Sequence, residues 1–379
     1  MSKAKLWESF TNNSLHKVQE VVDFLEEEYP PSNLDIMWSY DYFNWKLGDL
    51  NPAGRGFLAY ALHEGKVVGS ATLTKKRVLL DGIEYLASEV GDTYTSSGFR
   101  RKCKPKTMSQ TDANPNSYVN RSIFGRLITE LVNKSEESGV SIIYGTPNKN
   151  SCPGYTKRLS FINYEQYGNM SYYRPTAHFL LRKFPVLGPL GFIIKRLELL
   201  MIWIQNLLFT RVINRKVTVS VSMPTVDEFD KLWLRIKPEL GFSLVRDSLY
   251  WKHRYSDRPH IKYQFIKFHR NGELVAVAVT RKIVNNSDNV SVAIVEWMNE
   301  DGFKFGHILA VVMNLYKTSK VSYFYTWLQS SSKNSRIAMK NLFLIRKKQP
   351  IIFSGNTISK NLIDSEKELN IFLGSSDAV

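Results

Sequence analysis

The chain has 379 residues, of which 43% are hydrophobic and 23% charged, with a net charge of +16. The length suits two domains better than one core, and the hydrophobic fraction excludes a disordered chain. The charge calls for a polyanionic partner, such as nucleic acid, an anionic membrane face or a phosphorylated small molecule. Because no zinc-finger, helix-turn-helix or RNA-binding signature accompanies the charge, we expect no nucleic-acid partner.

The cysteine content and the amino terminus indicate a cytoplasmic protein. Two cysteines, Cys103 and Cys152, make no disulfide framework, and neither has metal-ligand spacing to a histidine. The first residues, MSKAKLWESFTNNS, contain no apolar run of the kind found in signal peptides. We therefore expect a reducing compartment, no metal site and no secretion signal.

The predicted elements of the first half begin with an amphipathic helix that follows Ser14, with an apolar stripe through Leu25. Trp45-Lys46 comes next, and strands at 57–62 and 67–74 then flank a turn at Gly65. A third strand, 85–90, leads into an arginine-rich turn and a polar loop at 104–120. A helix from residue 122 ends at Gly139, and a buried strand at 140–144 follows.

The second half repeats this order of elements. Trp251 stands 206 residues after Trp45 (251 − 45), and Gly272 stands 207 after Gly65 (272 − 65). A capping box at Thr225 predicts the first helix. The remaining predictions are strands at 292–297 and 321–327, helices at 308–316 and 335–344, and final strands around 351–353 and 371–373.

This pattern predicts a tandem duplication of one α+β domain with a mixed, mostly antiparallel sheet. We expect the domains to span 1–180 and 216–379, joined by a linking helix at 181–215. The linking segment is strongly apolar at 187–209, but Lys195, Arg196 and Glu198 argue against a membrane-spanning helix. We expect this helix to pack against the two halves, and peripheral contact with an anionic membrane is the alternative.

The start of the helix at residue 122 is a candidate anion site. Backbone N–H groups and the helix dipole converge at a helix amino terminus, and small residues let a phosphate approach. Basic residues before the helix, Arg100 and Arg101 among them, add positive charge. The second half has Asp301 and little basic reinforcement at the matching place, so we expect only the first half to hold a pyrophosphate.

The runs EVGDTYTSSGFRRK, SIFGRLITELV and TPNKNSCPGYTKRLSF resemble the GNAT superfamily of acyl-CoA-dependent N-acyltransferases over residues 57–165. The tandem arrangement is similar to sugar N-acyltransferases that act on nucleotide-linked amino sugars. The resemblance implies that strand 90–95 splays from its neighbour and binds the pantetheine arm of coenzyme A. It further implies a set of cofactor-binding residues: Tyr94, Thr95, Arg100, Arg101, Ser122, Ile123, Phe124, Gly125 and Asn148.

Acyl transfer to an amine needs a proton acceptor, an oxyanion donor and a group that protonates the leaving thiolate. Asp92 is the first candidate for the general base or the amine-orienting residue, and an aspartate that caps a turn is the alternative. Glu89 flanks the same strand end. His253 is a further candidate for proton transfer, and Tyr155 is one for the acid, although a packing tyrosine fits the pattern as well.

The candidates for binding the acceptor are Tyr250, Lys252, Arg254 and Glu296 of the second half. Arg254, like His253, is favoured because only one half has it, whereas Lys252 belongs to the Trp-Lys pair that both halves keep. Glu296 faces either the cleft or a buried partner. Trp45 and Trp251, which both halves keep, are expected in the core.

The resemblance therefore implies transfer of an acyl group, such as acetyl or 3-hydroxybutanoyl, from acyl-CoA to a dTDP-linked amino-dideoxy sugar for surface polysaccharide such as the O-antigen of lipopolysaccharide. One rival function is a peptidoglycan-type aminoacyl transferase of the same tandem fold. Another is a non-catalytic protein that binds anionic membranes.

Overall fold

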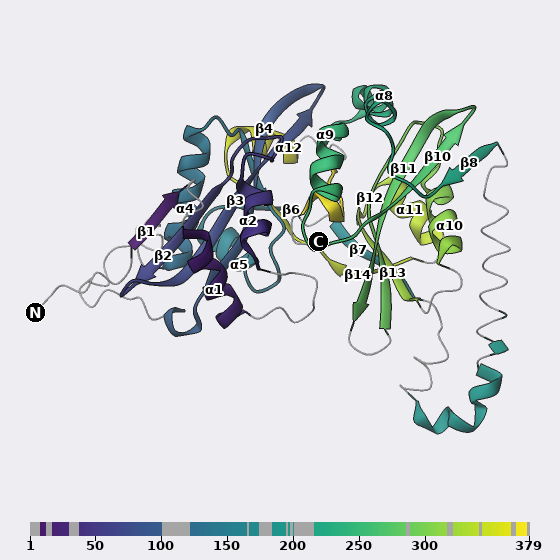
Figure 1. Ribbon diagram of the computed structural model, residues 1–379, viewed down its shortest axis with the longest axis horizontal. Helices are drawn as coiled ribbons and strands as arrows, with labels where there is room; N and C mark the ends of the chain where they lie inside the picture. Colours follow the sequence, from purple (N-terminus) through teal and green to yellow (C-terminus); the bar gives the residue numbers. More distant parts are fainter. Residues whose placement is uncertain are drawn as a thin grey trace, which may run out of the picture.

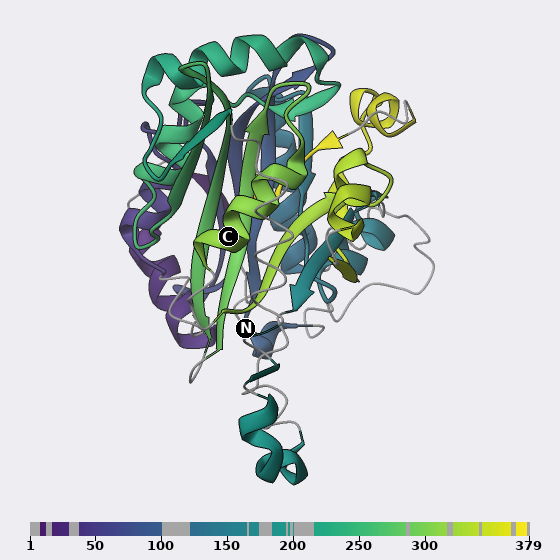
Figure 2. The same cartoon turned by 90° about the vertical axis from the view of Figure 1, so that its right-hand side faces the viewer.

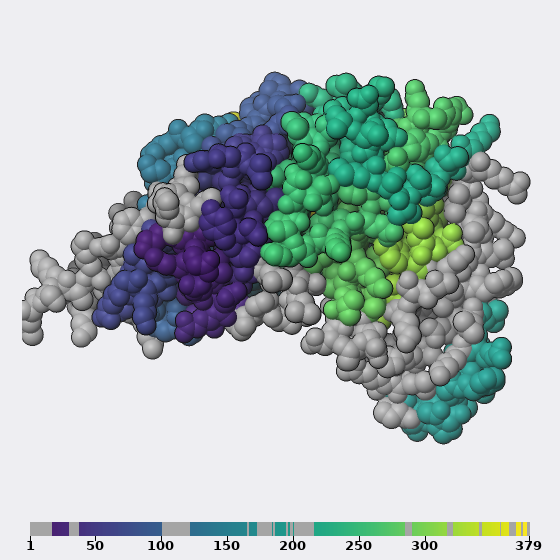
Figure 3. Space-filling model, in the orientation of Figure 1, coloured from purple at the N-terminus to yellow at the C-terminus, as the bar shows by residue number. Residues whose placement is uncertain are grey.

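A computed structural model shows two β-sheets side by side, each flanked by helices (Figure 1). It describes residues 8–12, 17–29, 38–100, 122–164, 167–173, 184–194, 196–197, 200, 216–285, 289–316, 321–340, 343–364 and 369–376. The predicted loop at 104–120 and the candidate Arg101 lie outside these residues. Viewed at a right angle, the second sheet lies in front of the first (Figure 2), and the space-filling view shows the halves in close contact (Figure 3).

The first sheet has the strand order β1, β2, β3, β4, β5, β15, β6, and most neighbouring strands are antiparallel. Only β4 and β5 run parallel along this path. The strands are β1 (Glu8–Asn12), β2 (Phe57–His63), β3 (Lys66–Leu80), β4 (Ile83–Thr95), β5 (Ile142–Gly145), β15 (Ile351–Phe353) and β6 (Ile162–Tyr164).

Alternation along β2 explains how helices cover both faces of this sheet. Successive strand residues point to opposite faces. Phe57 and Ala59 pack with α4 (Ile123–Glu137), whereas Leu58 and Tyr60 pack with α1 (Val18–Glu28) and α2 (Tyr40–Leu47). The predicted first helix, the strands at 57–62, 67–74 and 85–90, and the helix after residue 122 are therefore confirmed, with longer strands than expected.

The second sheet has the order β14, β7, β13, β12, β11, β10, β8. Its strands are β14 (Leu344–Lys348), β7 (Tyr167–Tyr173), β13 (Val321–Gln329), β12 (Asn289–Asn299), β11 (Glu273–Asn285), β10 (Gln264–Arg270) and β8 (Val217–Ser220). Helix α10 (Phe305–Leu315) covers one face, and α8 (Val226–Ile236) with α9 (Ser248–Trp251) covers the other. The predicted capping box is present, because Thr225 and Glu228 each bond to the other's backbone.

The two sheets exchange strands across the expected domain boundaries. Strand β7 follows the first-half elements in sequence but pairs with β13 and β14 of the second sheet. In return, β15 of the second half pairs with β5 and β6 of the first. Strand β9 (Phe242–Leu244) also extends β3, and β16 (Leu369–Asn370) pairs with β9. One apolar cluster spans both halves as a result.

Two predicted elements near the carboxyl end differ from the structure. Helix α11 covers only Lys333–Lys340, and Leu344 begins strand β14 because its backbone pairs with β7. The strand expected around 371–373 lies just before these residues, as the two-residue β16 (Leu369–Asn370), and it ends there because side chains satisfy the next backbone N–H groups. The N–H of Ile371 donates to the hydroxyl of Tyr167 at 3.2 Å, and the N–H of Phe372 donates to Oγ of Ser375 at 3.0 Å.

The linking segment differs from the expected packed helix. Its described part begins with a short 3₁₀ helix, Pro185–Leu190, followed by helical residues 191–194 and 196–197. Val186 is 83% exposed and Phe192 is 70% exposed. Pro185 and Pro189 suit a short 3₁₀ turn more than a continuous α-helix, and the described residues of the segment present exposed apolar side chains instead of a stripe that packs on the body. No helix among the described residues is long and apolar enough to cross a membrane.

Candidate active site

The candidate site begins where β4 parts from β5. The two strands pair in parallel from Ala87 to Val90, and the last pair is Val90 with Gly145. Strand β4 continues to Thr95, paired with β3 alone among the described strands. A Cβ added to Gly145 would lie 2.5 Å from the side chain of Val90. The glycine thus permits the close approach at the point of separation, and the expected splay of residues 90–95 is confirmed.

A β-bulge sits at the same point. The register of β3 with β4 shifts between Ser70 and Thr72, so that one extra residue of β4 is accommodated. Asp92 takes up this bulge with a left-handed φ of 44°. Such bulges redirect side chains and often lie beside active sites. The bulge directs the carboxylate of Asp92 toward α2.

The carboxylate of Asp92 is held by three neighbours. Nζ of Lys46 lies 2.8 Å from Oδ2, and the two side chains are only 2% and 10% exposed. Thr72 donates its hydroxyl to Oδ2 at 3.1 Å, and Tyr42 donates to Oδ1 at 3.4 Å. Burying a charged pair this completely costs desolvation free energy that apolar side chains in the same place would not cost. The cluster is therefore a candidate for chemistry.

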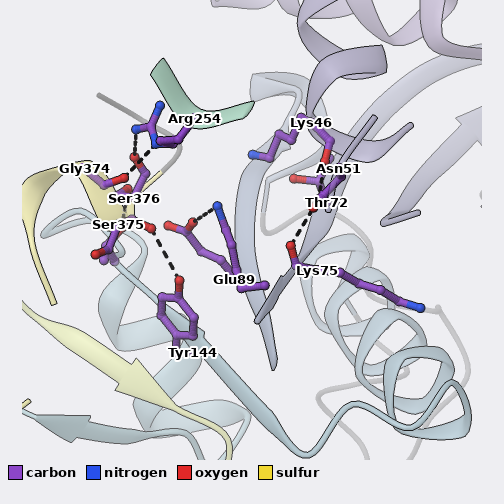
Figure 4. Close-up of polar contacts among 12 residues, drawn as sticks. Lys46, Asn51, Thr72, Lys75, Glu89, Tyr144, Arg254, Gly374, Ser375 and Ser376 are labelled. Carbon is purple, nitrogen blue, oxygen red and sulfur yellow. Dashed lines mark hydrogen bonds and ion pairs between the residues drawn. The ribbon is translucent and has the colours of Figure 1, made fainter. Parts of the chain in front are cut away.

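Lys46 is placed by the local fold of α2. Ser39 caps the helix by accepting from the N–H of Tyr42. Asn51 donates Nδ2 to the carbonyl oxygens of Lys46 and Lys75, at 3.2 and 3.1 Å, and so ties the end of α2 to β3. Figure 4 shows Asn51 between these two lysines, with Lys46 directed toward the site.

A cavity of about 200 Å³ opens on Asp92 and brings together five of the predicted residues: Asp92, Glu89, Tyr94, Tyr155 and Asn148. Helix α2, strand β4, the loop after β5 and helix α5 (Cys152–Arg158) supply most of its walls. Ser376, from the carboxyl end of the chain, completes the lining.

Glu89 and Tyr155 sit deep in this cavity. Glu89 is 3% exposed and lies 3.5 Å from Nζ of Lys76. The hydroxyl of Tyr155 lies 2.8 Å from Oγ1 of Thr93. Burial raises the pKa of Tyr155, which keeps its hydroxyl protonated at neutral pH. Burial likewise raises the pKa of Tyr94, and both tyrosines therefore offer hydrogen-bond donors.

The predicted anion-binding residues lie around the start of α4. Ser122 is the N-cap and accepts from the N–H of Gly125 at 2.9 Å. Ile123 is buried in the core, and the ring of Phe124 packs edge-on against Tyr155. The remaining first-turn N–H groups of an α-helix have no partner within the helix, so the backbone, more than the Ser122 hydroxyl, is suited to an anion.

Arg100 lies at the end of the splayed strand. Its Nε donates to the carbonyl oxygen of Thr95 at 3.0 Å, and its guanidinium also bonds to the hydroxyl of Tyr29. The guanidinium lies 5.5 Å from the centre of the Tyr29 ring. Arg100 is exposed and is thus anchored beside the strand, with its outer face toward solvent.

His253 lies between the two halves and does not line the cavity. Its ring stacks on the ring of Trp45, with 5.1 Å between the ring centres, and its Nε2 lies 2.9 Å from the carbonyl oxygen of Trp45. In return, Nε1 of Trp45 donates to the carbonyl oxygen of His253 at 2.7 Å. This reciprocal contact joins His253 to Trp45 of the first half and leaves it outside the Asp92 cavity.

The four predicted acceptor-binding residues lie apart from the cavity. Tyr250 donates to Glu296 at 2.7 Å, and Glu296 is completely buried, which raises the pKa of its carboxyl group. Lys252 is exposed. Arg254 is 1% exposed and binds backbone instead of solvent. Glu296 thus faces a buried partner, and the three-dimensional arrangement favours packing roles for Tyr250, Arg254 and Glu296.

Arg254 secures the carboxyl end of the chain against the site. Its guanidinium donates to the carbonyl oxygens of Gly374 and Ser376, both at 2.7 Å (Figure 4). The hydroxyl of Tyr144 donates to the carbonyl oxygen of Ser375 at 3.4 Å. Oγ of Ser376 lies 2.8 Å from the hydroxyl of Thr146, so the last described residue forms part of the cavity wall.

The same carboxyl-terminal segment lies at the matching splay of the second half. Strand β12 pairs with β13 only as far as Ala293, although β12 continues to Asn299. The ring of Phe372 packs edge-on against Trp297, with 4.5 Å between the ring centres. The guanidinium of Arg246 lies 4.9 Å from the centre of the Phe372 ring. A Cβ on Gly374 would meet Val295 at 3.0 Å. The second half therefore has Phe372 and Gly374 beside its splayed strand, and a cavity of about 290 Å³ remains between the end of β12 and the start of α10.

Sequence reasoning missed Lys46, Tyr42, Thr72 and Ser376. Lys46 stands between the apolar residues Trp45 and Leu47 in α2, which was a usable signal, but the Trp-Lys pair shared by both halves suggested a common role. The structure separates the two lysines, because Lys46 is 1% exposed whereas Lys252 is exposed. Ser376 carried no local signal. Among the described residues, no group of three His, Cys, Asp or Glu side chains is placed to hold a metal ion.

No protein-family model matches the sequence, and no curated protein matches it. Solved structures do match. A GCN5-related N-acetyltransferase from Anabaena variabilis shares 8% identity at a TM-score of 0.59, covering 91% of this chain and 72% of its own. A tandem GNAT protein from the clavulanic acid biosynthesis pathway shares 12% identity at 0.54, covering 93% and 99%. The fold is two GNAT-like domains in tandem.

The Saccharomyces cerevisiae N-myristoyltransferase, solved with myristoyl-CoA, is also similar. It shares 11% identity at a TM-score of 0.55, and the match covers 93% of this chain and 83% of the myristoyltransferase. These GNAT-like folds confirm the predicted α+β duplication. At such low identity the likeness concerns the fold, and the function has to be argued from the site.

Proposed function

We propose that the protein is an acyl-CoA-dependent N-acyltransferase. The observation that carries the proposal is Asp92, which a β-bulge presents to a cavity at the point where β4 leaves β5. The geometry provides an open strand edge, a helix amino terminus and a carboxylate paired with Lys46 within one site. The first two parts would bind and position the thioester, and the carboxylate would accept the proton of the attacking amine.

Coenzyme A fits the main-chain features of the first half. The edge of residues 91–95 that no described strand covers suits the amides of a pantetheine arm. The start of α4 suits the pyrophosphate, and Arg100 supplies a basic side chain at the end of the splayed strand. In the second half Phe372 and Gly374 lie beside the matching strand end, which favours the first half as the acyl-CoA site.

The cavity residues divide the chemistry between them. The amine must attack as the neutral base, and Asp92 would accept its hydrogen bond and its proton as the new C–N bond forms. Lys46 and Thr72 hold the carboxylate in place. Tyr155, protonated because burial raises its pKa, would donate to the sulfur of the leaving thiolate. Glu89 is the second carboxylate within the cavity and is the alternative proton acceptor.

A second cavity supports an acceptor that carries phosphate groups. It measures about 780 Å³ and shares Thr146, Pro147, Asn148 and Ser376 with the Asp92 cavity. Its other lining includes four lysines and one aromatic side chain from both halves: Lys149, Lys157, Lys347, Lys348 and Trp327. Lysines suit a diphosphate, and an indole suits a nucleobase.

We therefore propose a nucleotide-linked amino-dideoxy sugar, such as a dTDP sugar, as the acceptor. The sugar amine would reach Asp92 while the diphosphate lies among the lysines. The cavity of about 200 Å³ suits a short acyl group such as acetyl or 3-hydroxybutanoyl. Such a reaction would serve surface polysaccharide biosynthesis in the cytoplasm.

Two measurements test this proposal in sequence. Acetyl-CoA is expected to raise the melting temperature of the protein, because a ligand that binds only the folded state stabilises it. Mass spectrometry is then expected to show an N-acetylated dTDP-amino sugar and free CoA in equal amounts. Absence of both effects would rule the function out, and transfer from aminoacyl-tRNA instead would support the peptidoglycan-type rival.

A pair of double variants tests the lysine-lined cavity. Lys347→Gln with Lys348→Gln is expected to raise KM for the sugar nucleotide about tenfold or more, with KM for acetyl-CoA unchanged. The matched control is Lys231→Gln with Lys262→Gln, which removes two exposed lysines that do not line this cavity. Equal effects of the two double variants would show that net charge, and not this cavity, attracts the acceptor.

A further inference from the structure

The linking segment forms a projecting arm, which comprises the described residues from 184 to 200. Seven large apolar side chains on it are each at least 46% exposed. They are Phe184, Val186, Leu190, Phe192, Ile193, Leu197 and Leu200. A run of exposed apolar residues this dense is unusual on a soluble surface and marks an interaction site.

The arm stands away from both sheets. Figures 1 and 2 agree in placing its helical turns beyond the edge of the body, past the ends of the second sheet. None of its described residues belongs to the four apolar clusters of the core. The exposed apolar side chains of these described residues are therefore available to a partner.

The sequence around the arm indicates the charge of that partner. Between residues 182 and 216 the chain has seven basic residues, Arg182, Lys183, Lys195, Arg196, Arg211, Arg215 and Lys216, against the single acid Glu198. In the arm itself the guanidinium of Arg196 lies 5.2 Å from the ring of Phe192. Apolar and basic side chains side by side match the boundary between lipid tails and anionic headgroups.

We propose that the projecting arm docks the protein on an anionic membrane face. Its apolar side chains would enter the boundary between headgroups and acyl chains, while the basic residues bind phosphate groups of the lipids. The net charge of +16 favours the same partner. The arm would hold the two GNAT-like domains at the membrane without crossing it, and this role does not depend on the reaction that the site performs.

Vesicle sedimentation of the full chain tests the proposal. The wild-type protein is expected to sediment with vesicles of equimolar phosphatidylcholine and phosphatidylglycerol, and to stay in solution with pure phosphatidylcholine. Phe192→Glu with Ile193→Glu is expected to weaken binding about tenfold or more. The control, Leu234→Glu with Leu249→Glu, adds the same charge at leucines that are 66% and 59% exposed elsewhere, and it should bind like the wild type.

Three results would overturn the proposal. The first is wild-type protein that stays in solution with anionic vesicles. The second is equal binding by the arm variant and the control variant, which would assign the attraction to net charge alone. The third is a wild-type dimer in sedimentation velocity that the arm variant turns into a monomer without any vesicle binding, which would assign the arm to a second copy of the chain.

Discussion

Replacing Lys46 by methionine tests whether the buried ion pair is the anchor of the site. The substitution keeps the length of the side chain but removes the ammonium 2.8 Å from Asp92, where the side chains are 2% and 10% exposed. Breaking such a pair leaves a carboxylate in a place that water barely reaches, which costs about 3–5 kcal/mol. For domains of this size, that loss lowers the melting temperature by roughly 10 °C.

The duplicated fold provides the control for this experiment. Lys252 is the equivalent lysine of the second half and is exposed, so Lys252→Met is expected to change stability by about 0.5 kcal/mol or less. In the double variant Lys46→Met with Asp92→Asn the unpaired charge is absent, and a coupling energy of about 2 kcal/mol is expected. Equal melting temperatures for Lys46→Met and Lys252→Met would refute the reasoning.

Two further predictions concern stability and the carboxyl-terminal segment. Burial alone would raise the pKa of Glu228, but bonds from the Thr225 backbone, His269 and Lys267 lower it to about 2. The resulting stabilisation is present above the unfolded pKa near 4.5 and is lost as pH falls toward 2. Glu228→Gln should therefore flatten the melting temperature over this range, and an unchanged slope would contradict the assignment. Arg254→Met should make the segment at Ser376 easier for carboxypeptidase to digest, and it should lower the rate of acyl transfer. If the variant resists digestion as well as the wild type does, other contacts hold the segment.

Local patterns predicted most of the fold. The turn glycines Gly65 and Gly272 have φ angles of 79° and 83°, which explains why both copies keep glycine there. Apolar periodicity located α1 and α4, and the capping box at Thr225 located the start of α8. Each of these signals acts within a few residues of the chain.

The strand exchange had no local signal. Strand β7 reads as an ordinary strand, and only pairing with β13, about 150 residues later, decides which sheet it joins. The same holds for Phe372, whose place between Trp297 and Arg246 depends on how the chain returns to the first half. Long-range pairing of this kind is set by the whole fold and not by local propensity.

The site was predicted in part for the same reason. Asp92, Glu89 and Tyr155 lie near one splayed strand end, so the family resemblance located them together. Lys46 is 46 residues away from Asp92, and its burial became visible only when α2 packed on β3. His253 was a candidate for proton transfer, but its ring stacks on Trp45 and so forms a contact between the halves.

The most direct test of the central claim is the turnover number of Asp92→Asn with acetyl-CoA and the amino-sugar nucleotide. The account predicts a kcat about 10² to 10⁴ times lower than that of the wild type, with the melting-temperature shift by acetyl-CoA preserved. Asp257→Asn, at an exposed aspartate outside the cavity, should keep the wild-type kcat. A wild-type kcat for Asp92→Asn would contradict the assignment of Asp92 as the residue that receives the proton of the amine.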